Sequence, residues 1–301
     1  MTSRLEETTE RAVGRQRSVR AVGVARADRA RLGSNRLAHV VLVLGSLVMM
    51  FPFLWQLKMA VSTQAEITAI PPDLLPKGMQ WSNFSEVFQR LPFLEQFWTS
   101  VAVTLGRTIG QLVLCSMAGY AFARMSFRFK GILLALILSI LMVPSQVYLI
   151  PQYQLIQRLG WLDSIQGIVA PGIFSAFGTF LMMQFFKSIP VELEEAARLD
   201  GCNPWQTFWK VVLPVARPGL TSLAIITVLA SWGDLLWPLV VTSSPEKMPL
   251  AVGLATLSGY QGSISPGVMM AAAAMAMAPI LVLFVILQRR VVEGIAFSGL
   301  K

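Results

Sequence analysis

Six long apolar runs alternate with polar segments along the chain. A helix of about 20 residues crosses the ~30 Å hydrocarbon core of a bilayer, and each run has about that length. The runs cover residues 37–59, 97–122, 131–150, 165–186, 220–241 and 268–287. Prolines and glycines inside several of them favour a packed bundle over a lone anchor. The pattern therefore predicts an all-α polytopic membrane protein with six transmembrane helices.

Two of the polar segments are longer than a tight connection requires. Residues 1–36 hold nine arginines among small polar residues, so we expect a disordered cytoplasmic tail near anionic lipid headgroups. Residues 60–96 combine prolines with several aromatic residues, which predicts a short interfacial helix on the outer surface. The apolar run after the tail is longer than the core of a secretory signal, so we expect an uncleaved first span.

The segment 190–219, between the fourth and fifth runs, carries signals for a short helix. Pro190 suits a first helical position, where its missing N–H is not needed, and acidic residues follow in the opening turns. Glu194 and Arg198 have the spacing of a favourable i,i+4 ion pair. Gly201 supplies the left-handed residue with which helices commonly end.

A second helix is predicted directly after this glycine. Asn203 is a good N-cap, Pro204 suits the first position, and Gln206 completes a capping box. Pro214 and Pro218 then close the helix. The segment 190–219 therefore predicts two short helices joined at a glycine elbow.

Basic residues are distributed unevenly between the two sets of loops. If the N-terminus is cytoplasmic, nineteen lysines and arginines fall on the inner side and five on the outer side, while Arg107 lies within a span. The positive-inside rule therefore predicts that both termini and the elbow lie in the cytoplasm.

The composition agrees with a membrane protein and restricts its chemistry. Of the residues, 54% are hydrophobic and only 14% are charged. The net charge of +9 comes mainly from the tail and from residues that flank spans, which indicates topology rather than nucleic-acid binding. His39 is the only histidine, which nearly excludes a His-based metal site or a His-containing catalytic triad. We expect no catalytic residue, no metal site and no nucleic-acid partner.

Ionisable groups inside the spans are scarce, and each is a candidate functional group. Asp234 is the one carboxylate within a predicted span, and with Trp232 and Trp237 it could offer a sugar an acceptor for hydroxyls and apolar ring faces. A structural hydrogen bond between helices, or a position close to the surface, is the alternative for Asp234. Arg107 has two alternatives: it could form an ion pair with Asp234, or its side chain could extend toward the membrane–water interface.

One motif in the elbow resembles a known family. The pattern is Glu195-Ala196-Ala197-x3-Gly201-x9-Val211-x-Leu213-Pro214. It resembles the EAA motif of the membrane subunits of bacterial ATP-binding cassette importers, and it departs only at Val211, where isoleucine is common. The alternative is a surface loop that only stabilises its own chain.

The resemblance extends over nearly all of residues 37–301 and leaves out the tail. The segments AGYAFARMSFRFKG, MVPSQVYLIPQY, SWGDLLWPLVV and LQRRVVEGIAFSGLK are similar to sugar permeases typified by the second membrane subunit of the maltose importer. Gly233 and Thr99 depart from asparagines that are frequent in relatives. Both departures concern the expected translocation path, so the identity of the sugar stays open.

The resemblance implies a type I importer transmembrane domain, with a core of about residues 97–290 and a cytoplasmic coupling loop at 190–219. The coupling residues would be Glu195, Ala196, Ala197, Gly201, Leu213 and Pro214. The implied partners are a second permease, two ATP-binding cassette ATPase subunits, an extracytoplasmic sugar-binding protein and membrane lipid.

No G-x4-G-K-[ST] stretch is present, so we expect ATP and Mg²⁺ to bind the partner ATPases and no cofactor to bind this chain. The expected function is ATP-driven import of a sugar across a bacterial plasma membrane by alternating access. A polyol phosphate such as glycerol phosphate is the alternative cargo. Two alternatives belong to other classes of protein. A secondary transporter is less favoured because it should show internal repeats and ionisable relays, and a membrane enzyme is less favoured because it should show convergent reactive groups.

Overall fold

The computed structural model describes residues 38–71, 73–259 and 264–299, and within these ranges it is helical without strands. The Arg-rich segment 1–36, for which the sequence predicts disorder, lies outside the described residues. The chain divides into two compact units, residues 1–58 and 59–301, and each is described by itself. The first predicted span is one helix, Ala38–Ala60, which is long and apolar enough to cross a membrane.

The second unit consists of helices and short helical turns, in which the η elements are 3-10 turns except for the π-helical η4. In chain order they are α2 (Gln64–Thr68), α3 (Ser82–Arg90), α4 (Phe93–Arg124), α5 (Lys130–Ser139), η1 (Ile140–Met142), η2 (Ser145–Tyr148), α6 (Leu149–Arg158), α7 (Ile165–Val169), η3 (Ala170–Gly172), α8 (Ala176–Ser188), α9 (Glu192–Leu199), α10 (Pro204–Gln206), η4 (Thr207–Val212), α11 (Leu213–Val215), α12 (Arg217–Trp232), α13 (Leu236–Val241), η5 (Pro245–Lys247), α14 (Leu250–Gly259) and α15 (Pro266–Gly299).

Two of the predicted spans in this unit are continuous helices. The helix α4 is unbroken over 32 residues, and α15 has a membrane-length apolar part at Pro266–Ile286. Together with Ala38–Ala60, three described helices are long and apolar enough to cross a membrane, and the number rises to six if each bent pair counts as one span. The all-helical, multi-pass class is therefore confirmed.

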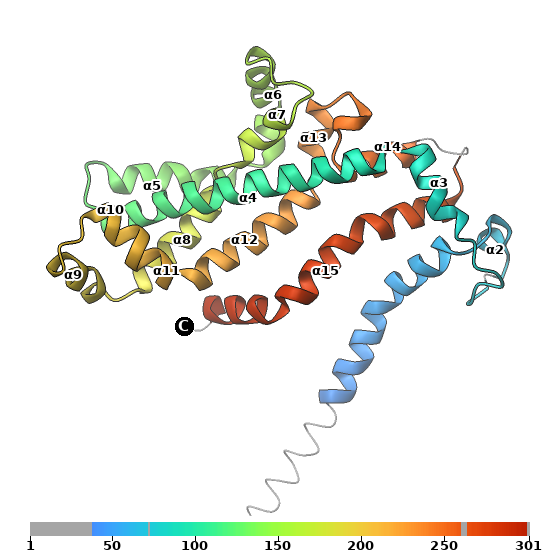
Figure 1. The fold of residues 1–301 in the computed structure, drawn as a ribbon, viewed down its shortest axis with the longest axis horizontal. Helices are drawn as coiled ribbons and strands as arrows, with labels where there is room; N and C mark the ends of the chain where they lie inside the picture. The colour runs from blue at the N-terminus through green and yellow to red at the C-terminus, as the bar shows by residue number, and fades with distance from the viewer. Residues whose placement is uncertain (1–37, 72, 260–263, 300–301) are drawn as a thin grey trace, which may run out of the picture. The chain divides into compact units, whose positions relative to one another are not determined.

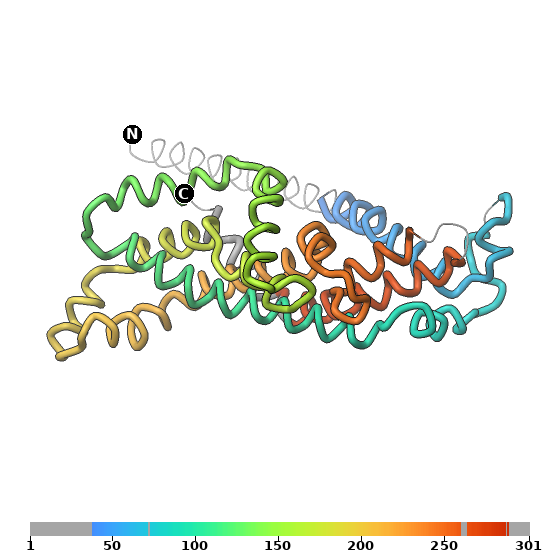
Figure 2. Tube along the Cα trace, turned by 90° about the horizontal axis from the view of Figure 1, so that it is seen from above, coloured from blue at the N-terminus to red at the C-terminus, as the bar shows by residue number. Residues whose placement is uncertain are grey.

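The third predicted span, 131–150, is not a straight helix. The helical stretches Lys130–Met142 and Ser145–Arg158 meet at an angle of 101° (Figure 2). Val143 has an extended backbone, with φ −94° and ψ 121°, because the ring of Pro144 disfavours helical geometry in the residue before it. The predicted apolar run is therefore helical on both sides of a sharp break at Val143 and Pro144.

The fourth and fifth predicted spans also contain breaks. The stretches Ile165–Gly172 and Ala176–Ser188 are bent by 45°, and Ser175 caps the second stretch through its hydroxyl. In the predicted span 220–241, α12 ends at Trp232 and α13 begins at Leu236. Asp234 therefore lies in a helix break rather than in the middle of a helix.

The segment 60–96 contains two short helices, α2 and α3, where the sequence predicts one. Helix α3 packs against α15, and its Asn83 and Val87 side chains are buried. The Asn83 side-chain amide donates to the carbonyls of Ala60 at 2.9 Å and Ser62 at 3.1 Å. This buried polar contact joins α3 to the start of the same segment, and the packing of α3 on α15 attaches the segment to the helical bundle.

Helix α4 organises the second unit. It packs along α8 and α12, and α12 packs against α15 (Figure 1). Elements α9 to α11 lie together at one end of this arrangement, and α3 lies at the other end (Figures 1 and 2). One side chain on α4 can therefore contact the elbow while another contacts the break after α12.

Candidate functional site

The elbow forms largely as the sequence predicts, with a later start. Helix α9 begins at Glu192, so Pro190 lies two residues before it rather than at its first position. Gly201 has φ +85°, a backbone conformation that costs little only for glycine. The predicted left-handed glycine between the two helices is confirmed.

The capping box of the second helix is also confirmed. The Asn203 side-chain oxygen accepts from the backbone N–H of Gln206 at 2.8 Å, and the Gln206 side-chain oxygen accepts from the backbone N–H of Asn203 at 3.0 Å. The helix continues through η4 and α11, and the backbone turns at Ala216 before α12 begins. The helix ends at Val215, between Pro214 and Pro218, as these prolines predict, although each proline itself lies in the first turn of α11 or α12.

The predicted Glu194–Arg198 pair does not form. Glu194 is buried, and its Oε1 lies 2.7 Å from Arg124 Nε on α4. The Tyr120 hydroxyl donates to Glu194 Oε2 at 3.0 Å. Spacing along one helix thus suggested the wrong partner, because burial of Glu194 selects a basic group from another element.

The motif residues divide into exposed and packed positions. Glu195, Ala196 and Gly201 are exposed, whereas Ala197 is buried. Leu213 is partly buried against a core cluster that includes Phe208, and Pro214 is partly buried. Within α9, Ala197 packs inward, whereas Leu193 and Ala196 are exposed.

Two apolar side chains in the elbow are exposed although the motif does not include them. Leu199 is 89% exposed and Trp205 is 59% exposed. Along the chain they lie on either side of Gly201, and exposed apolar groups of this size often belong to an interaction surface. Leu199 is the last residue of an amphipathic helix and Trp205 lies in the first turn of the next one, which was the available sequence signal.

A second candidate site lies where α4 passes the break after α12. Arg107 Nη1 contacts Asp234 Oδ2 at 2.7 Å, and Arg107 Nη2 donates to the Ile168 carbonyl at 2.9 Å. Of the two alternatives for Arg107, the pairing with Asp234 is therefore the one observed. Gly172 provides the space for the guanidinium, since a Cβ there would lie 2.6 Å from Arg107 Nε.

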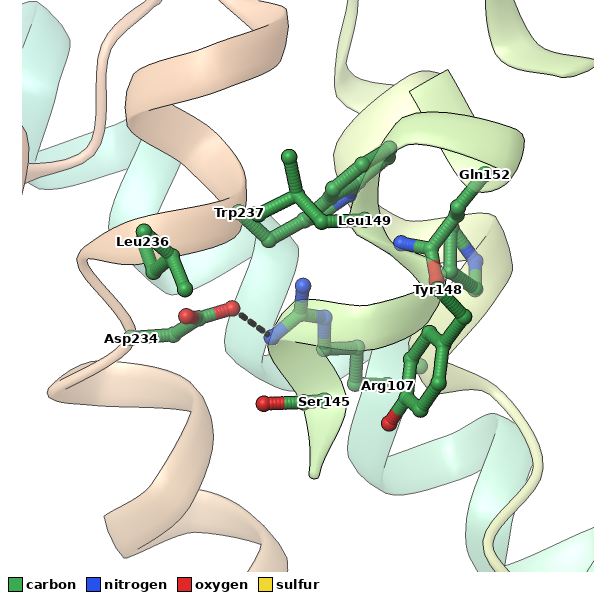
Figure 3. A pocket seen from close by; sticks show the side chains of 10 residues that line it. Arg107, Ser145, Tyr148, Leu149, Gln152, Asp234, Leu236 and Trp237 are labelled. Atoms are coloured by element: carbon green, nitrogen blue, oxygen red, sulfur yellow. Dashed lines mark hydrogen bonds and ion pairs between the residues drawn. The ribbon is translucent and has the colours of Figure 1, made fainter. Parts of the chain in front are cut away.

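This ion pair borders a cavity of about 250 Å³ (Figure 3). Figure 3 shows Asp234 and Gln152 on opposite sides of the Arg107 side chain. The lining residues are Arg107, Ser145, Tyr148, Leu149, Gln152, Pro171, Gly172, Asp234, Leu236 and Trp237. The cavity thus combines charged, hydroxyl, amide and apolar groups, as a site for a polar organic molecule requires.

The four residues predicted for the substrate path do not all meet. Trp237 lines the cavity, and its indole N–H donates to the Gly167 carbonyl at 3.1 Å. Trp232 instead donates to the Ala276 carbonyl at 3.1 Å and lines a separate apolar hollow. Ser145, Tyr148 and Gln152 were missed. Ser145 and Tyr148 follow the break at Pro144 inside a predicted apolar run, and Gln152 lies just after the end of that run.

A third polar cluster connects two loops outside the spans. The Asp163 carboxylate accepts from the amides of Ser243 and Ser244 at 3.0 Å each, from the Ser244 hydroxyl at 2.6 Å and from the Lys247 ammonium at 3.1 Å. The hydrogen bonds from Ser244 in particular hold the pKa of Asp163 well below its usual range. Among the described residues, no three His, Cys, Asp or Glu side chains are grouped to hold a metal ion.

The long apolar helices and the bent helix pairs define a helical, multi-pass membrane protein. A profile of the family described as "binding-protein-dependent transport system inner membrane component" matches residues 21–296, and the chain belongs to this family. It is therefore a permease subunit of an ABC importer. The match begins within the segment 1–36, which the motif resemblance leaves out.

Individual relatives agree with this assignment. The chain is 30% identical over 275 residues to the sn-glycerol-3-phosphate transport system permease protein UgpE of Yersinia enterocolitica, covering 89% of this chain and 98% of the relative. It is 33% identical over 230 residues to the arabinooligosaccharides transport system permease protein AraQ of Halalkalibacterium halodurans, covering 75% and 81%.

Solved structures show the same fold. A chain of a bacterial ABC transporter involved in import of the acidic polysaccharide alginate aligns with a TM-score of 0.74 and 25% identity, covering 84% of this chain and 94% of that chain. A chain of an alginate ABC transporter in complex with an alginate pentasaccharide-bound periplasmic protein aligns with a TM-score of 0.52 and 15% identity, covering 86% and 93%.

Proposed function

We propose that this chain is a permease subunit that imports a carbohydrate by alternating access, driven by ATP hydrolysis on separate subunits. The observation that carries the proposal is the elbow, with exposed motif residues on a capped two-helix unit and no phosphate-binding motif in the chain. Its partners would be a second permease, two ATPase subunits that bind ATP and Mg²⁺, and the extracytoplasmic binding protein that the family description implies.

The coupling role falls on the elbow residues. Glu195 is exposed and can meet a basic group of an ATPase, while the small side chains of Ala196 and Ala197 permit close packing of another backbone on one side and of this chain on the other. Gly201 permits the turn between the two helices, and Leu213 packs the second helix against the core, with Pro214 partly buried beside it. A rigid, capped unit of this kind can transmit force to the spans.

The carbohydrate is proposed to pass the cavity bordered by Arg107 and Asp234. This pair offers donors and acceptors to neighbouring hydroxyls, and Trp237 offers an apolar face. A volume of about 250 Å³ lies below the ~300–1,000 Å³ of typical sites for drug-sized ligands, so one ring-sized unit fits better than an oligosaccharide. Participation of Trp232 in the path stays a prediction.

A polyol phosphate is the second candidate cargo, and relatives named as glycerol-3-phosphate permeases favour it. A phosphate group would compete with Asp234 for the Arg107 guanidinium, because guanidinium binds phosphate strongly. Uptake assays with the cognate binding protein and a panel of sugars and glycerol phosphate separate the two cargoes. A carbohydrate permease transports a neutral sugar and is not inhibited by excess glycerol phosphate.

The decisive experiment joins purification with transport. Tagged protein expressed with its neighbours should retain an ATPase, and proteoliposomes should take up substrate only with internal ATP in the orientation that exposes the elbow to it. Glu195→Lys should abolish uptake and weaken ATPase retention, whereas Glu192→Lys, an exposed acid of the same helix, should leave both intact. Wild-type protein that retains no ATPase, or a Glu195→Lys variant with normal uptake, would overturn the proposal.

Membrane orientation is proposed from the distribution of basic residues. Both termini and the elbow would lie in the cytoplasm of a bacterial plasma membrane. A reporter active only outside the membrane should work when inserted after Met79 and should be inactive when fused after Lys301. The reverse activities would refute this orientation.

A further inference from the structure

The last turns of α4 contact both arms of the elbow, where the first arm is α9 and the second arm is the helix that runs from α10 to α11. Glu194, in the first arm, is 2% exposed and lies against Arg124, and the same guanidinium donates to the Ile189 carbonyl just before α9. The Tyr120 hydroxyl donates to Glu194 at 3.0 Å, while the Tyr120 ring packs on Phe208 of the second arm with centroids 4.9 Å apart. We define these residues, Tyr120, Arg124, Glu194 and Phe208, as the clamp.

The stability of the fold does not require that the clamp contain two buried charges. Burying two ions costs free energy that their attraction only partly offsets, and apolar residues of similar size often replace such a pair without loss. Arg124 and Glu194 are nevertheless in contact at 2.7 Å with side-chain exposures of 13% and 3%. Such a pair fixes one arrangement of two elements, because sliding either element leaves a buried charge without its partner.

Helix α4 also carries the residue at the central cavity. Arg107 lies seventeen positions before Arg124, a separation of about 26 Å at ~1.5 Å per residue. The helix is unbroken between them, whereas its neighbours are interrupted near Arg107 by the bend before Ser175 and by the break that contains Asp234. A displacement of the elbow would thus be carried along α4 to the Arg107–Asp234 contact with little loss to bending.

We propose that Arg124 and Tyr120 are positioning residues that clamp the elbow to α4, so that movement of the elbow shifts Arg107 relative to Asp234 and opens or closes the central cavity. This inference rests on the proposed function, which assigns the elbow to an ATPase. It adds the specific element that carries the motion and the two side chains that attach the elbow to it.

The test measures transport per ATP hydrolysed in the complete complex. The double variant Arg124→Met with Glu194→Gln removes both buried charges at similar volume, and Tyr120→Phe removes only the hydroxyl. The double variant should retain its ATPase and its binding-protein-stimulated hydrolysis, while uptake per ATP falls about tenfold, within the usual range of coupling between sites. Tyr120→Phe should lower the ratio less.

Matched controls use exposed charges beside the clamp. Arg128→Met and Glu192→Gln change charges of the same kind that are exposed to solvent, and both should keep the wild-type ratio. A rescue is available because the chain has two cysteines, of which Cys115 is buried. In a Cys202→Ser background, Arg124→Cys with Glu194→Cys should uncouple transport, and a short bifunctional thiol reagent should restore it.

The outcomes separate this inference from the proposed function. Wild-type uptake per ATP in the double variant, or a proportional fall of hydrolysis and uptake together, would overturn the clamp, since a purely structural role predicts one of these results. Failure of the rescue by a verified cross-link would overturn it as well. A wild-type complex without ATPase or ATP-dependent uptake would instead contradict the proposed function.

Discussion

Two buried ion pairs on one helix differ in their surroundings. Arg107–Asp234 and Arg124–Glu194 both have a contact of 2.7 Å, and both join α4 to residues far along the chain. The acid of the first pair is 24% exposed and borders a cavity, whereas the acid of the second is 3% exposed and is covered by Tyr120. The first pair can therefore exchange partners with a ligand or water, and the second cannot.

The difference explains why similar chemistry serves different roles. In an ion pair that borders a cavity, water or a ligand can replace either partner. Separating the two charges therefore costs little free energy, and the molecule that enters the cavity decides what replaces the partner. A closed ion pair opens only if a charge is left in an apolar environment, so it resists separation. The accessible pair is suited to recognition and the closed pair to attachment.

The largest expected effect comes from breaking the closed pair. Glu194→Ala leaves the Arg124 guanidinium buried without its counter-ion, which should lower the free energy of unfolding by about 3–5 kcal/mol. Thermal unfolding in detergent measures the change. Glu195→Ala, at the exposed neighbouring position, should stay within about 0.5 kcal/mol of wild type. Equal losses for the two variants would contradict the distinction.

Breaking the accessible pair should lower the free energy of unfolding less than breaking the closed pair, but it should strongly reduce transport. Asp234→Ala leaves Arg107 facing a cavity that water can enter, so we expect a loss of about 2–3 kcal/mol together with strongly reduced uptake. The same unfolding assay and a proteoliposome uptake assay measure both effects. If Asp234→Ala destabilises the protein as much as Glu194→Ala, access of water is not what distinguishes the pairs.

A substitution at Gly172 perturbs the accessible pair without removing a charge. An added Cβ would lie 2.6 Å from Arg107 Nε and 2.8 Å from Arg107 Cδ, so Gly172→Ala must displace the guanidinium, at a cost of about 1–2 kcal/mol. Uptake should fall with a smaller stability loss than for Asp234→Ala. Gly131→Ala, in helix α5 with open space around it, is the control and should be neutral or slightly stabilising. Normal uptake by Gly172→Ala would show that Arg107 need not keep this position.

The sequence predicts long helices well and their interruptions poorly. Helix α4 and the helix Ala38–Ala60 follow directly from apolar length. Apolar length does not show where the backbone turns, so the break at Pro144 and the break at Gly233 stayed inside predicted spans. Prolines occur inside α15 as well, at Pro279, where the helix continues. A proline alone therefore does not identify a break, because neighbouring helices decide whether its freed carbonyl is satisfied.

The two sites show the same limit. The elbow is encoded locally, by Gly201 and the Asn203 capping box, and both were predictable. Glu194 has an equally good local partner in Arg198, but its burial against α4 selects Arg124. Arg107 and Asp234 could be paired because few ions occur in the spans. Partners chosen by tertiary packing become predictable only where the alternatives are few.

The Asp163 cluster provides a solvated reference for the two buried pairs. Hydrogen bonds from Ser244 and Ser243 lower the pKa of Asp163, so the ionised form stabilises the fold above the unfolded pKa of about 3.9, and this stabilisation is lost as the pH falls below about 4 toward the folded pKa. Asp163→Asn should therefore cost about 1 kcal/mol at pH 7. The difference in melting temperature between wild type and variant should be constant from pH 7 to 5 and shrink below pH 4. A difference that grows on acidification would contradict the assignment.

The smallest expected effect tests whether local signals or the clamp hold the elbow. Asn203→Ala removes the capping box and should cost about 1 kcal/mol, the usual value of an N-cap, without changing uptake per ATP. The cap stabilises only the start of the second helix, whereas the clamp attaches both arms to α4, so loss of the cap leaves the attachment intact. Measuring unfolding and the uptake ratio of Asn203→Ala beside the Arg124→Met/Glu194→Gln variant separates the two contributions. A fall in the uptake ratio for Asn203→Ala as large as for the double variant would mean that rigidity of the elbow, rather than its attachment to α4, controls coupling.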